Sequence, residues 1–298
     1  MPMNTPANEH PARLRVGVIG PGRAGTALAR ALARGGHHVT AASAVSAASK
    51  NRVRDNFPDA KIAEPRDVIA DADLVLLTVP DDALAALVQG LVSTGAPFRG
   101  RLVAHASGAH GITVLQSATE AGALPMALHP VMTFTGRDDD VERLKGVSFG
   151  VTAPEPIRPA AEVLVIEMGG EPVYIPEENR ALYHAALAFG ANHLVTLVAE
   201  AGDLLRQAGA DFPDRMLGPL LSAALDNALR LGDNGLTGPV ARGDDGTIAA
   251  HIAAIDAADP RARNAYLALA RLTADRALAA GLLRADDAAR LLDVLGDK

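Results

Sequence analysis

LRVGVIGPGRAGTALARAL, residues 14 to 32, is the stretch that decides the fold of this chain. It opens with a short β-branched apolar run and closes with apolar residues that recur at helical spacing. Between these parts, Gly20, Gly22 and Gly25 form the pattern G-x-G-x-x-G. The stretch therefore predicts a buried strand, a tight glycine turn and an amphipathic helix.

The spacing of these glycines is typical of a dinucleotide site. Gly20 permits the tight turn, Gly22 lets the backbone approach a pyrophosphate, and Gly25 lets the helix pack closely on the strand. A phosphate would then rest on the free N–H groups at the helix N-terminus. The alternative is a tight turn with no ligand. We expect cofactor contacts from the whole turn, namely Gly20, Pro21, Gly22, Arg23, Ala24 and Gly25.

Apolar runs that follow this stretch predict a sheet. A second strand is expected in GGHHVTAAS, and others at 74–79, 101–107, 123–129, 147–152 and 172–175, most of them separated by helical segments. This alternation predicts an α/β, Rossmann-type, doubly wound and mostly parallel sheet with helices on both faces. Ligands of such sheets bind beyond the carboxyl ends of the strands. The predicted crevice groups Val79 and Pro80, as cofactor contacts, with Ser107 and His129.

The end of the second strand predicts the type of cofactor. NAD sites usually carry an acidic residue about 20 residues after the glycines, but this region holds Ser43, followed by Lys50 and Arg52. Hydroxyl groups and cations suit a 2′-phosphate, so we predict NADP, with NAD as the alternative. In the other interpretation, Lys50 and Arg52 form only the solvated face of the next helix.

The second half of the chain reads as helical. Residues 1–12 are polar and broken by prolines, so a disordered leader is expected there. Strand signals stop after PVYIP, which predicts a dinucleotide-binding domain at 13–177 and an all-α domain at 178–298. A long helix expected at 178–208 has a wide apolar stripe and must pack against other helices. These can belong to the same chain or to a second subunit. We therefore expect a homodimer through the helical domain.

The predicted long helix carries polar residues within ALYHAALAFGANH, residues 181 to 193. His184 and Asn192 lie two turns apart and about 80° around the axis, so both can face one side. Histidine can give the proton that accompanies hydride transfer, and asparagine can orient a carbonyl oxygen. We predict His184, Asn192 and Ser107 as catalytic residues. A buried histidine satisfied by a backbone carbonyl is the alternative for His184.

Two further stretches supply predicted substrate contacts. In ALHPVMTF, His129 stands at a strand end where a proline turns the chain. In LTGPVARGDDGT, residues 236 to 247, either Asp244 or Asp245 can cap the following helix, and Arg242 can clamp a substrate carboxylate. Both interpretations stay open, and His129, Arg242 and Asp244 are predicted to bind substrate.

Composition excludes several classes of site. A formal net charge of -7 and 3% aromatic residues argue against nucleic acid as a partner. The absence of cysteine excludes disulfides and thiolate chemistry. His105, His110 and His129 lack a carboxylate at matching spacing, so no metal is predicted. No uninterrupted apolar run of about 20 residues is present, so we expect a soluble, cytoplasmic protein without a membrane partner.

The chain resembles a known protein family in several motifs: VGVIGPGRAGTALARAL, HASGAHG, HPVMTF, YHAALAFGANHLVTL and LTGPVARGDDGTI. They are similar to those of Rossmann-like proteins that carry the C-terminal domain of unknown function 2520, over nearly all of the chain after residue 13. This family is similar in plan to the 6-phosphogluconate dehydrogenase-like oxidoreductases, among them ketopantoate reductase, prephenate dehydrogenase and pyrroline-5-carboxylate reductase. The resemblance implies an NAD(P)-dependent oxidoreductase whose helical domain forms a dimer.

The resemblance also implies a position for catalysis. In β-hydroxyacid dehydrogenases and ketopantoate reductases the corresponding helix carries a catalytic lysine with an asparagine one turn later. Here His184 aligns with the lysine, Ala188 with the next turn and Asn192 with the turn after it. The resemblance makes a small 2-oxo acid the expected substrate, with ketopantoate first. The alternatives are an imine reductase, a prephenate-type or deazaflavin-linked dehydrogenase, and a dinucleotide-binding protein without catalysis.

Overall fold

The computed structural model describes residues 13–296, and the chain divides into two compact units, Met1–Ala188 and Phe189–Lys298. The predicted leader at 1–12 lies outside the described residues. The division between the units falls inside one long helix, α8 (Arg180–Gln207). The predicted boundary near residue 177, placed where strand signals stop, therefore precedes this division and stays a prediction.

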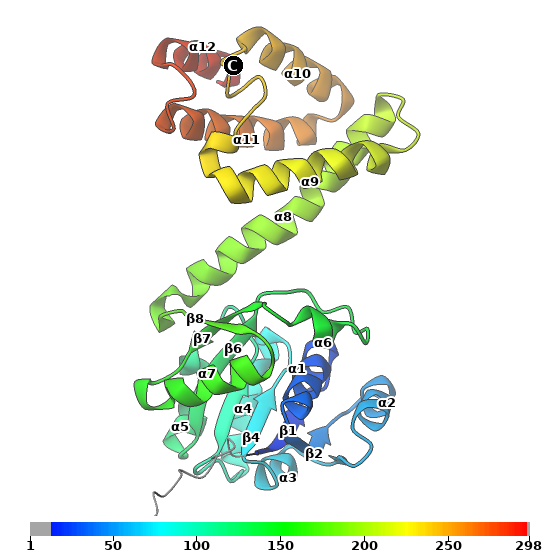
Figure 1. Ribbon diagram of the computed structural model, residues 1–298, viewed down its shortest axis with the longest axis vertical. Coiled ribbons are helices and arrows are strands. Elements are labelled where there is room, and N and C mark those ends of the chain that lie inside the picture. Colours follow the sequence, from blue (N-terminus) through cyan, green and yellow to red (C-terminus); the bar gives the residue numbers. More distant parts are fainter. Residues whose placement is uncertain (1–12, 297–298) are drawn as a thin grey trace, which may run out of the picture. The chain divides into compact units, whose positions relative to one another are not determined.

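The first unit is built on a mostly parallel sheet. Within residues 13–296, eight strands pair in the order β3-β2-β1-β4-β5-β6-β7-β8 (Figure 1). All neighbours are parallel except β6 and β7, which are antiparallel. This confirms the predicted fold class. The strands are β1 (Arg15–Ile19), β2 (His38–Ser43), β3 (Lys61–Ile62), β4 (Leu74–Leu77), β5 (Leu102–His105), β6 (Leu124–Pro130), β7 (Ser148–Thr152) and β8 (Glu171–Tyr174).

Helices cover both faces of this sheet, and β4 shows why its sequence is apolar throughout. Leu74 and Leu76 pack into one core cluster with α1, α2, α6 and α7, whereas Val75 and Leu77 pack into the other with α3, α4 and α5. Successive side chains of a strand point to opposite faces, so a strand covered on both sides is apolar at every position. The helices are α1 (Arg23–Arg34), α2 (Ala47–Asn56), α3 (Pro65–Ala70), α4 (Asp81–Ser93), α5 (Gln116–Glu120), α6 (Asp140–Arg143) and α7 (Arg158–Glu167).

The second unit is helical, as predicted. Its core joins α10, α11 and α12 around residues such as Ile248, Leu267 and Leu291. The elements after α8 are α9 (Pro213–Leu231), α10 (Asp245–Ala258), α11 (Pro260–Ala279) and α12 (Ala285–Leu295). Short 3-10 turns complete the described chain: η1 (Ile112–Leu115), η2 (Glu155–Ile157), η3 (Glu177–Asn179) and η4 (Gly232–Gly235).

Helices α8 and α9 leave apolar side chains uncovered. Only Pro213 is buried on α9, while Leu220 is 65% and Leu229 is 79% exposed. On the part of α8 in the second unit, Leu194, Val195 and Leu197 are exposed. By length and composition, the segment Glu177–Gln207 would suffice to cross a membrane, although such a helix is weak evidence of a membrane protein. The second unit thus presents an apolar surface that its own helices do not cover.

Candidate functional site

The glycine turn has the geometry that its spacing predicted. Gly20 has a φ of +86°, which favours glycine, and a Cβ there would lie 2.9 Å from Val79 Cγ1. A Cβ on Gly25 would overlap Thr78 Oγ1, and the Thr78 hydroxyl donates a hydrogen bond of 2.8 Å to the Gly20 carbonyl. The turn is thus packed tightly against the end of β4, and two of its glycines are required by that packing.

Gly22 differs from these two glycines because its Cβ position is open. Apart from the adjoining residues, the atom nearest to this position is the Gly20 carbonyl oxygen, at 3.9 Å. A ligand can therefore approach the backbone at Gly22. Gly22 is also the N-cap of α1 and offers no side chain to the first N–H groups of the helix. Those N–H groups have no partner inside the helix and favour an anion. The turn therefore fits the pyrophosphate of a dinucleotide.

Residues from β2, α2 and β4 surround this turn. Ser43 ends β2 in register with Ile19, the residue before Gly20. The Arg52 Nη1 donates a hydrogen bond of 2.9 Å to the Pro21 carbonyl, so Arg52 reaches the turn rather than extending only into solvent. Lys50 is half-buried on α2. Val79 is half-buried after β4, and Pro80 is the N-cap of α4.

A cluster of aromatic side chains lies at the carboxyl ends of β5 and β6. The Tyr183 hydroxyl is 2.8 Å from Nδ1 of His129, and the His129 ring centroid is 6.2 Å from that of His184. Gly108, which follows β5, lies against both imidazoles: a Cβ there would be 2.7 Å from His184 Cδ2 and 2.8 Å from His129 Nε2. These residues belong to the first unit, so the structure brings two predicted residues, His129 and His184, together with the unpredicted Tyr183.

Burial sets the protonation state of this cluster. Burial, together with the charges of Arg180 and His184, lowers the pKa of His129 to about 4. Burial also raises the pKa of Tyr183. At neutral pH the imidazole is therefore uncharged and the phenol keeps its proton. In the tautomer in which the phenol donates to Nδ1 of His129, the imidazole proton lies on Nε2, the atom beside Gly108.

Arg180 lies beneath this cluster and was missed by the sequence analysis. Its side chain is 2% exposed, and it donates from Nε to Thr152 Oγ1 at 2.7 Å and from Nη2 to the carbonyls of Ala127 and Gly150. Its Cζ is 5.6 Å from the ring centroid of Tyr183. Burial lowers the pKa of Arg180. An arginine in the first turn of a helix normally lies in solvent, so no pattern in the sequence marked this one.

Ser107 and His105 stabilise the turn after β5. Ser107 is buried, its N–H donates to Nδ1 of His105 at 3.2 Å, and its Oγ accepts from the His110 N–H. The His105 Nε2 donates to the Gly111 carbonyl at 2.8 Å, and burial lowers the pKa of His105 to about 4. His105 is thus a satisfied core histidine. Among residues 13–296, no group of three or more His, Asp or Glu side chains is arranged to hold a metal ion.

Three predicted site residues belong to the second unit. Asn192 and Arg242 are exposed there. Asp244 caps α10, with its carboxylate oxygens accepting from the Thr247 N–H at 3.0 Å and the Thr247 hydroxyl at 2.7 Å. Of the two capping candidates, the structure therefore selects Asp244. The predicted roles of Asn192, Arg242 and Asp244 toward substrate stay predictions.

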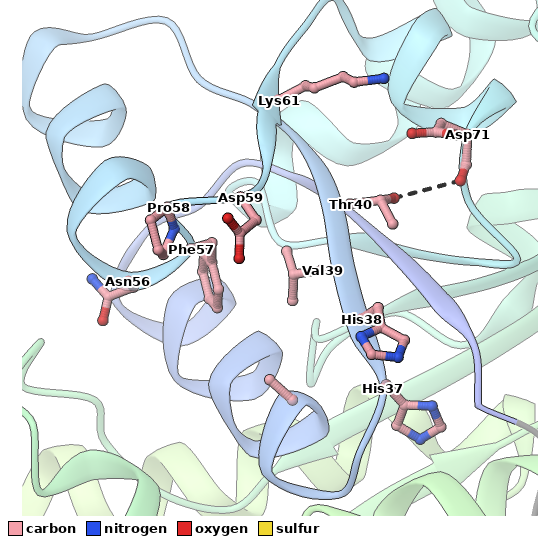
Figure 2. Close-up of a pocket in the computed structure, with 11 residues that line it drawn as sticks. His37, His38, Val39, Thr40, Asn56, Phe57, Pro58, Asp59, Lys61 and Asp71 are labelled. Atoms are coloured by element: carbon pink, nitrogen blue, oxygen red, sulfur yellow. Dashed lines mark hydrogen bonds between the residues drawn. The ribbon is translucent and has the colours of Figure 1, made fainter.

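Another cavity, of about 480 Å³, lies at the amino-terminal half of β2 (Figure 2). His38, Thr40, Asp59, Lys61 and Asp71 are among its lining residues. The glycine turn and the aromatic cluster lie at the carboxyl ends of the strands, where α/β sheets bind their ligands. The cavity in Figure 2 is therefore not the candidate active site.

Comparisons with solved structures show the fold. A candidate NADP oxidoreductase from Bacteroides fragilis is 23% identical, with a TM-score of 0.69, 88% of this chain covered and 98% of the other. An imine reductase from Pseudomonas sp. is 20% identical, with a TM-score of 0.64 and coverages of 96% and 100%. Pyrroline carboxylate reductase from Plasmodium falciparum, with NADP bound, is 12% identical, with a TM-score of 0.58 and coverages of 93% and 98%.

Family models match both parts of the chain. The model of the Rossmann-like domain matches residues 2–130, and that of the domain of unknown function DUF2520 matches residues 147–273. No curated protein sequence matches the chain. The two matches follow each other in the order that the motifs predicted, and the fold agrees with both. This chain is therefore a Rossmann-like protein with a C-terminal DUF2520 domain.

Proposed function

We propose that this protein is an NADP-dependent oxidoreductase that reduces the carbonyl group of a small 2-oxo acid. The observation that carries the proposal is the pair formed by Tyr183 and the uncharged His129, at the carboxyl ends of β5 and β6, on the same edge of the sheet as the glycine turn. The similarity to solved structures named as oxidoreductases, one of them with NADP bound, supports it. Ketopantoate is the first substrate to test.

The chain has residues suited to holding NADP. The glycine turn and the N-terminus of α1 suit the pyrophosphate, while Ser43, Lys50 and Arg52 suit a 2′-phosphate. In the sheet β4 pairs with β1 and β5 pairs with β4, so the carboxyl ends of these strands would border a dinucleotide held by the glycine turn. When bound, the cofactor supplies the hydride, and the protein must supply a proton.

We expect the proton to come from His129. Its Nε2–H gives the proton to the substrate oxygen while the Tyr183 hydroxyl passes its own proton to Nδ1. One N–H bond breaks and another forms, so the imidazole stays neutral and the negative charge moves to the phenolate. The Arg180 guanidinium near the Tyr183 ring stabilises that charge, and water then returns the proton to the phenolate.

His184 is the competing proton donor and was the first prediction from sequence. Its ring lies against Gly108 and near His129, so both imidazoles can reach the same small volume. In either assignment Ser107 and Asn192 are proposed to orient the oxygen, and Arg242 to hold the substrate carboxylate through two parallel hydrogen bonds. Removing the Tyr183 hydroxyl slows proton transfer only if His129 is the donor.

Reduction of a C=N bond is the second candidate reaction. Two of the similar solved structures are an imine reductase and a pyrroline carboxylate reductase. An imine nitrogen can accept the same proton from His129 and the same hydride. This function would replace the 2-oxo acid by a small cyclic or secondary imine, without a change in the roles of Tyr183 and His129.

The test is a titration followed by turnover assays. NADPH fluorescence should change on binding to the protein, and NADPH should then be oxidised with ketopantoate or another small 2-oxo acid. A panel of cyclic imines, assayed in parallel, distinguishes the second candidate. Binding of NADPH without turnover on either panel would contradict both reactions and leave a dinucleotide-binding protein. Absence of NADPH binding would contradict the whole proposal.

We also propose that the protein forms a homodimer through α8 and α9. A 19-residue helix such as α9 gains most of its stability from a packed face, yet only Pro213 on it is buried. A groove of about 660 Å³ beside α8, lined by apolar residues that include Leu197, Leu204 and Leu269, could take helices of a second copy. Light scattering of the purified protein should give twice the mass of 30.7 kDa.

A monomer in solution, or a protein extracted from cells only with detergent, would contradict this dimer. The second result would favour a membrane as the cover for α8, whose length and composition would suffice for a span.

A further inference from the structure

A small pocket lined by arginines lies beside the glycine turn. It has a volume of about 60 Å³ and is bounded by the first turns of α1, by α2 and by the segment 136–140 that leads into α6. Its cationic lining residues are Arg23, Arg30, Arg52 and Arg137, and we call it the arginine pocket. Only Arg23 and Arg52 were predicted from sequence to contact a cofactor, so the pocket includes two arginines for which the sequence predicted no contact.

Positive charge exceeds negative charge in the arginine pocket. Two carboxylates line it, Asp138 and Asp140. Asp138 is paired with Arg30, whose Nη1 donates to it at 2.9 Å. In the described part of the chain, neither Arg23 nor Arg52 has a carboxylate oxygen within 4.0 Å. The pocket can therefore accept a further anion.

The second carboxylate of the pocket is occupied by its own loop. Asp140 is 1% exposed and accepts hydrogen bonds from the Gly136 N–H at 2.7 Å and from the Thr135 hydroxyl at 2.9 Å. Burial by itself would raise the pKa of Asp140, but these bonds outweigh it, so the pKa is lowered and the segment before α6 is held in place. Gly136 has a φ of +80°, and a Cβ there would lie 3.0 Å from Arg23 Cγ. The loop thus lies directly against Arg23.

Thr26 adds an unsatisfied group to this pocket. The residue is 7% exposed and lines the pocket from α1, but its Oγ1 has no hydrogen-bond partner. Buried hydroxyl groups are nearly always bonded to protein, water or a ligand, so this one indicates a missing partner. One water molecule needs about 10 to 15 Å³ of such a volume, so the pocket has room for a group of several heavy atoms such as phosphate but not for a nucleoside.

We propose that the arginine pocket binds a phosphomonoester dianion. Guanidinium groups match phosphate oxygens through paired hydrogen bonds, and the α1 N-terminus beside the pocket favours the same charge. The phosphate can come from the 2′-phosphate of NADP, an arm that rests on the function proposed above and is favoured because Arg52 also bonds to Pro21 in the glycine turn. It can also come from free phosphate or a phosphorylated metabolite.

Arg137→Ala tests the proposal, because the Arg137 side chain is 78% exposed and its loss should leave the fold intact. The dissociation constants of NADPH and NADH are measured by cofactor fluorescence, and that of inorganic phosphate by calorimetry. Arg99→Ala, an exposed arginine in the loop before β5, makes the same change of charge away from the pocket. Arg23→Ala repeats the test from the glycine turn.

If the 2′-phosphate is the ligand, Arg137→Ala weakens NADPH binding about tenfold and leaves NADH binding unchanged. If free phosphate is the ligand, inorganic phosphate binds the unaltered protein, Arg137→Ala weakens it about tenfold, and the ratio of the NADPH and NADH constants stays the same. Arg99→Ala should change none of these values. Either of the first two results supports the pocket.

The proposal is overturned if inorganic phosphate does not bind and both arginine variants leave the preference for NADPH over NADH unchanged. If the protein still binds NADPH in that case, the proposed function stands and the proposed role of the arginine pocket is wrong. Phosphate binding that depends on Arg137, in a protein that binds neither NADPH nor NADH, has the opposite meaning: the pocket stands and the proposed function falls.

Discussion

Strand β4 and helix α9 are both rich in apolar residues, but only β4 is covered by its own chain. All four residues of β4 are at most 4% exposed, because helices lie on both faces of the sheet. Helix α9 has a single buried residue among 19. The first unit therefore completes its own core, whereas in the second unit the core of α10, α11 and α12 leaves α8 and α9 uncovered. The two units therefore differ in how fully their apolar side chains are buried by the same chain.

The sharpest test of the first unit is its aromatic pair. Tyr183→Phe removes the hydroxyl that bonds to His129 without changing the shape of the ring. We expect turnover to fall by about 10²- to 10⁴-fold, the usual contribution of a positioned acid or base, with NADPH binding unchanged. Tyr174→Phe, at an exposed tyrosine, is the control. Unchanged turnover in Tyr183→Phe together with a large loss in His184→Ala would make His184 the donor.

The second unit should respond most to a charge on the apolar side of α9. Leu220→Glu would place an unpaired carboxylate in the proposed dimer interface, which costs about 4 kcal/mol and weakens dimerisation about a thousandfold. Sedimentation at micromolar concentration should then show a monomer. Ser222 lies about 160° around the helix axis from Leu220, so Ser222→Glu adds the same charge away from Leu220 and should remain dimeric. Equal masses for the two variants would contradict an interface at Leu220.

Acid should weaken the first unit through its buried histidines. The folded-state pKa of His105 is about 4, below the usual 6.5, so the unfolded chain binds a proton more readily. The contribution of His105 is complete above pH 6.5 and is lost as the pH falls toward 4, by about 3 kcal/mol. Urea unfolding between pH 7 and pH 4.5 measures this loss. His105→Gln should flatten the dependence on pH, and an unchanged slope would refute the assignment.

Close packing at the glycine turn predicts a smaller loss. Gly25→Ala places a methyl group on Thr78 Oγ1, and such overpacking costs about 1 to 3 kcal/mol of unfolding free energy. The turn must shift to relieve it, so NADPH binding should weaken as well. Gly90→Ala is the matched control, because no atom lies within 4 Å of its Cβ position and alanine favours the helix. Thermal unfolding and NADPH titration of both variants make the comparison.

The smallest effect should be found in the part of the second unit that has its own core. Asp244→Ala removes the N-cap of α10 and should cost about 1 kcal/mol. Asp245→Ala changes the same charge one residue later, where the side chain is not the cap, and should cost less. Urea unfolding of the two variants at equal concentration gives the difference. If the order is reversed, Asp245 is the cap in solution.

The glycine turn and the sheet could be predicted because local patterns determine them. Gly20 and Gly25 are required by a turn and by a close contact, and both requirements appear as a fixed spacing. Strand β3 (Lys61–Ile62) was missed because two residues carry no periodicity. The antiparallel pairing of β7 with β6 was not foreseen either, since strand direction depends on tertiary contacts rather than on composition.

The candidate site was predicted less completely. His129 and His184 are 55 positions apart, and each was selected separately as an unusual polar residue in an apolar segment. Their proximity, and the bond from Tyr183 to His129, follow from long-range packing of α8 on β6, which leaves no mark in a single sequence. Arg180 was missed for the same reason, since its partners are backbone carbonyls and Thr152 from three distant strand positions.

Gly108 has a consequence for how this site can change during evolution. A methyl group at this position would lie 2.7 Å from the His184 ring and 2.8 Å from the His129 ring, so we expect glycine and the imidazole pair to occur together. Among homologous chains, alanine or a larger residue at position 108 should accompany the loss of the histidine at 129 or at 184. A count of such paired replacements across many sequences would show, without any assay, whether the two-ring arrangement depends on glycine at position 108.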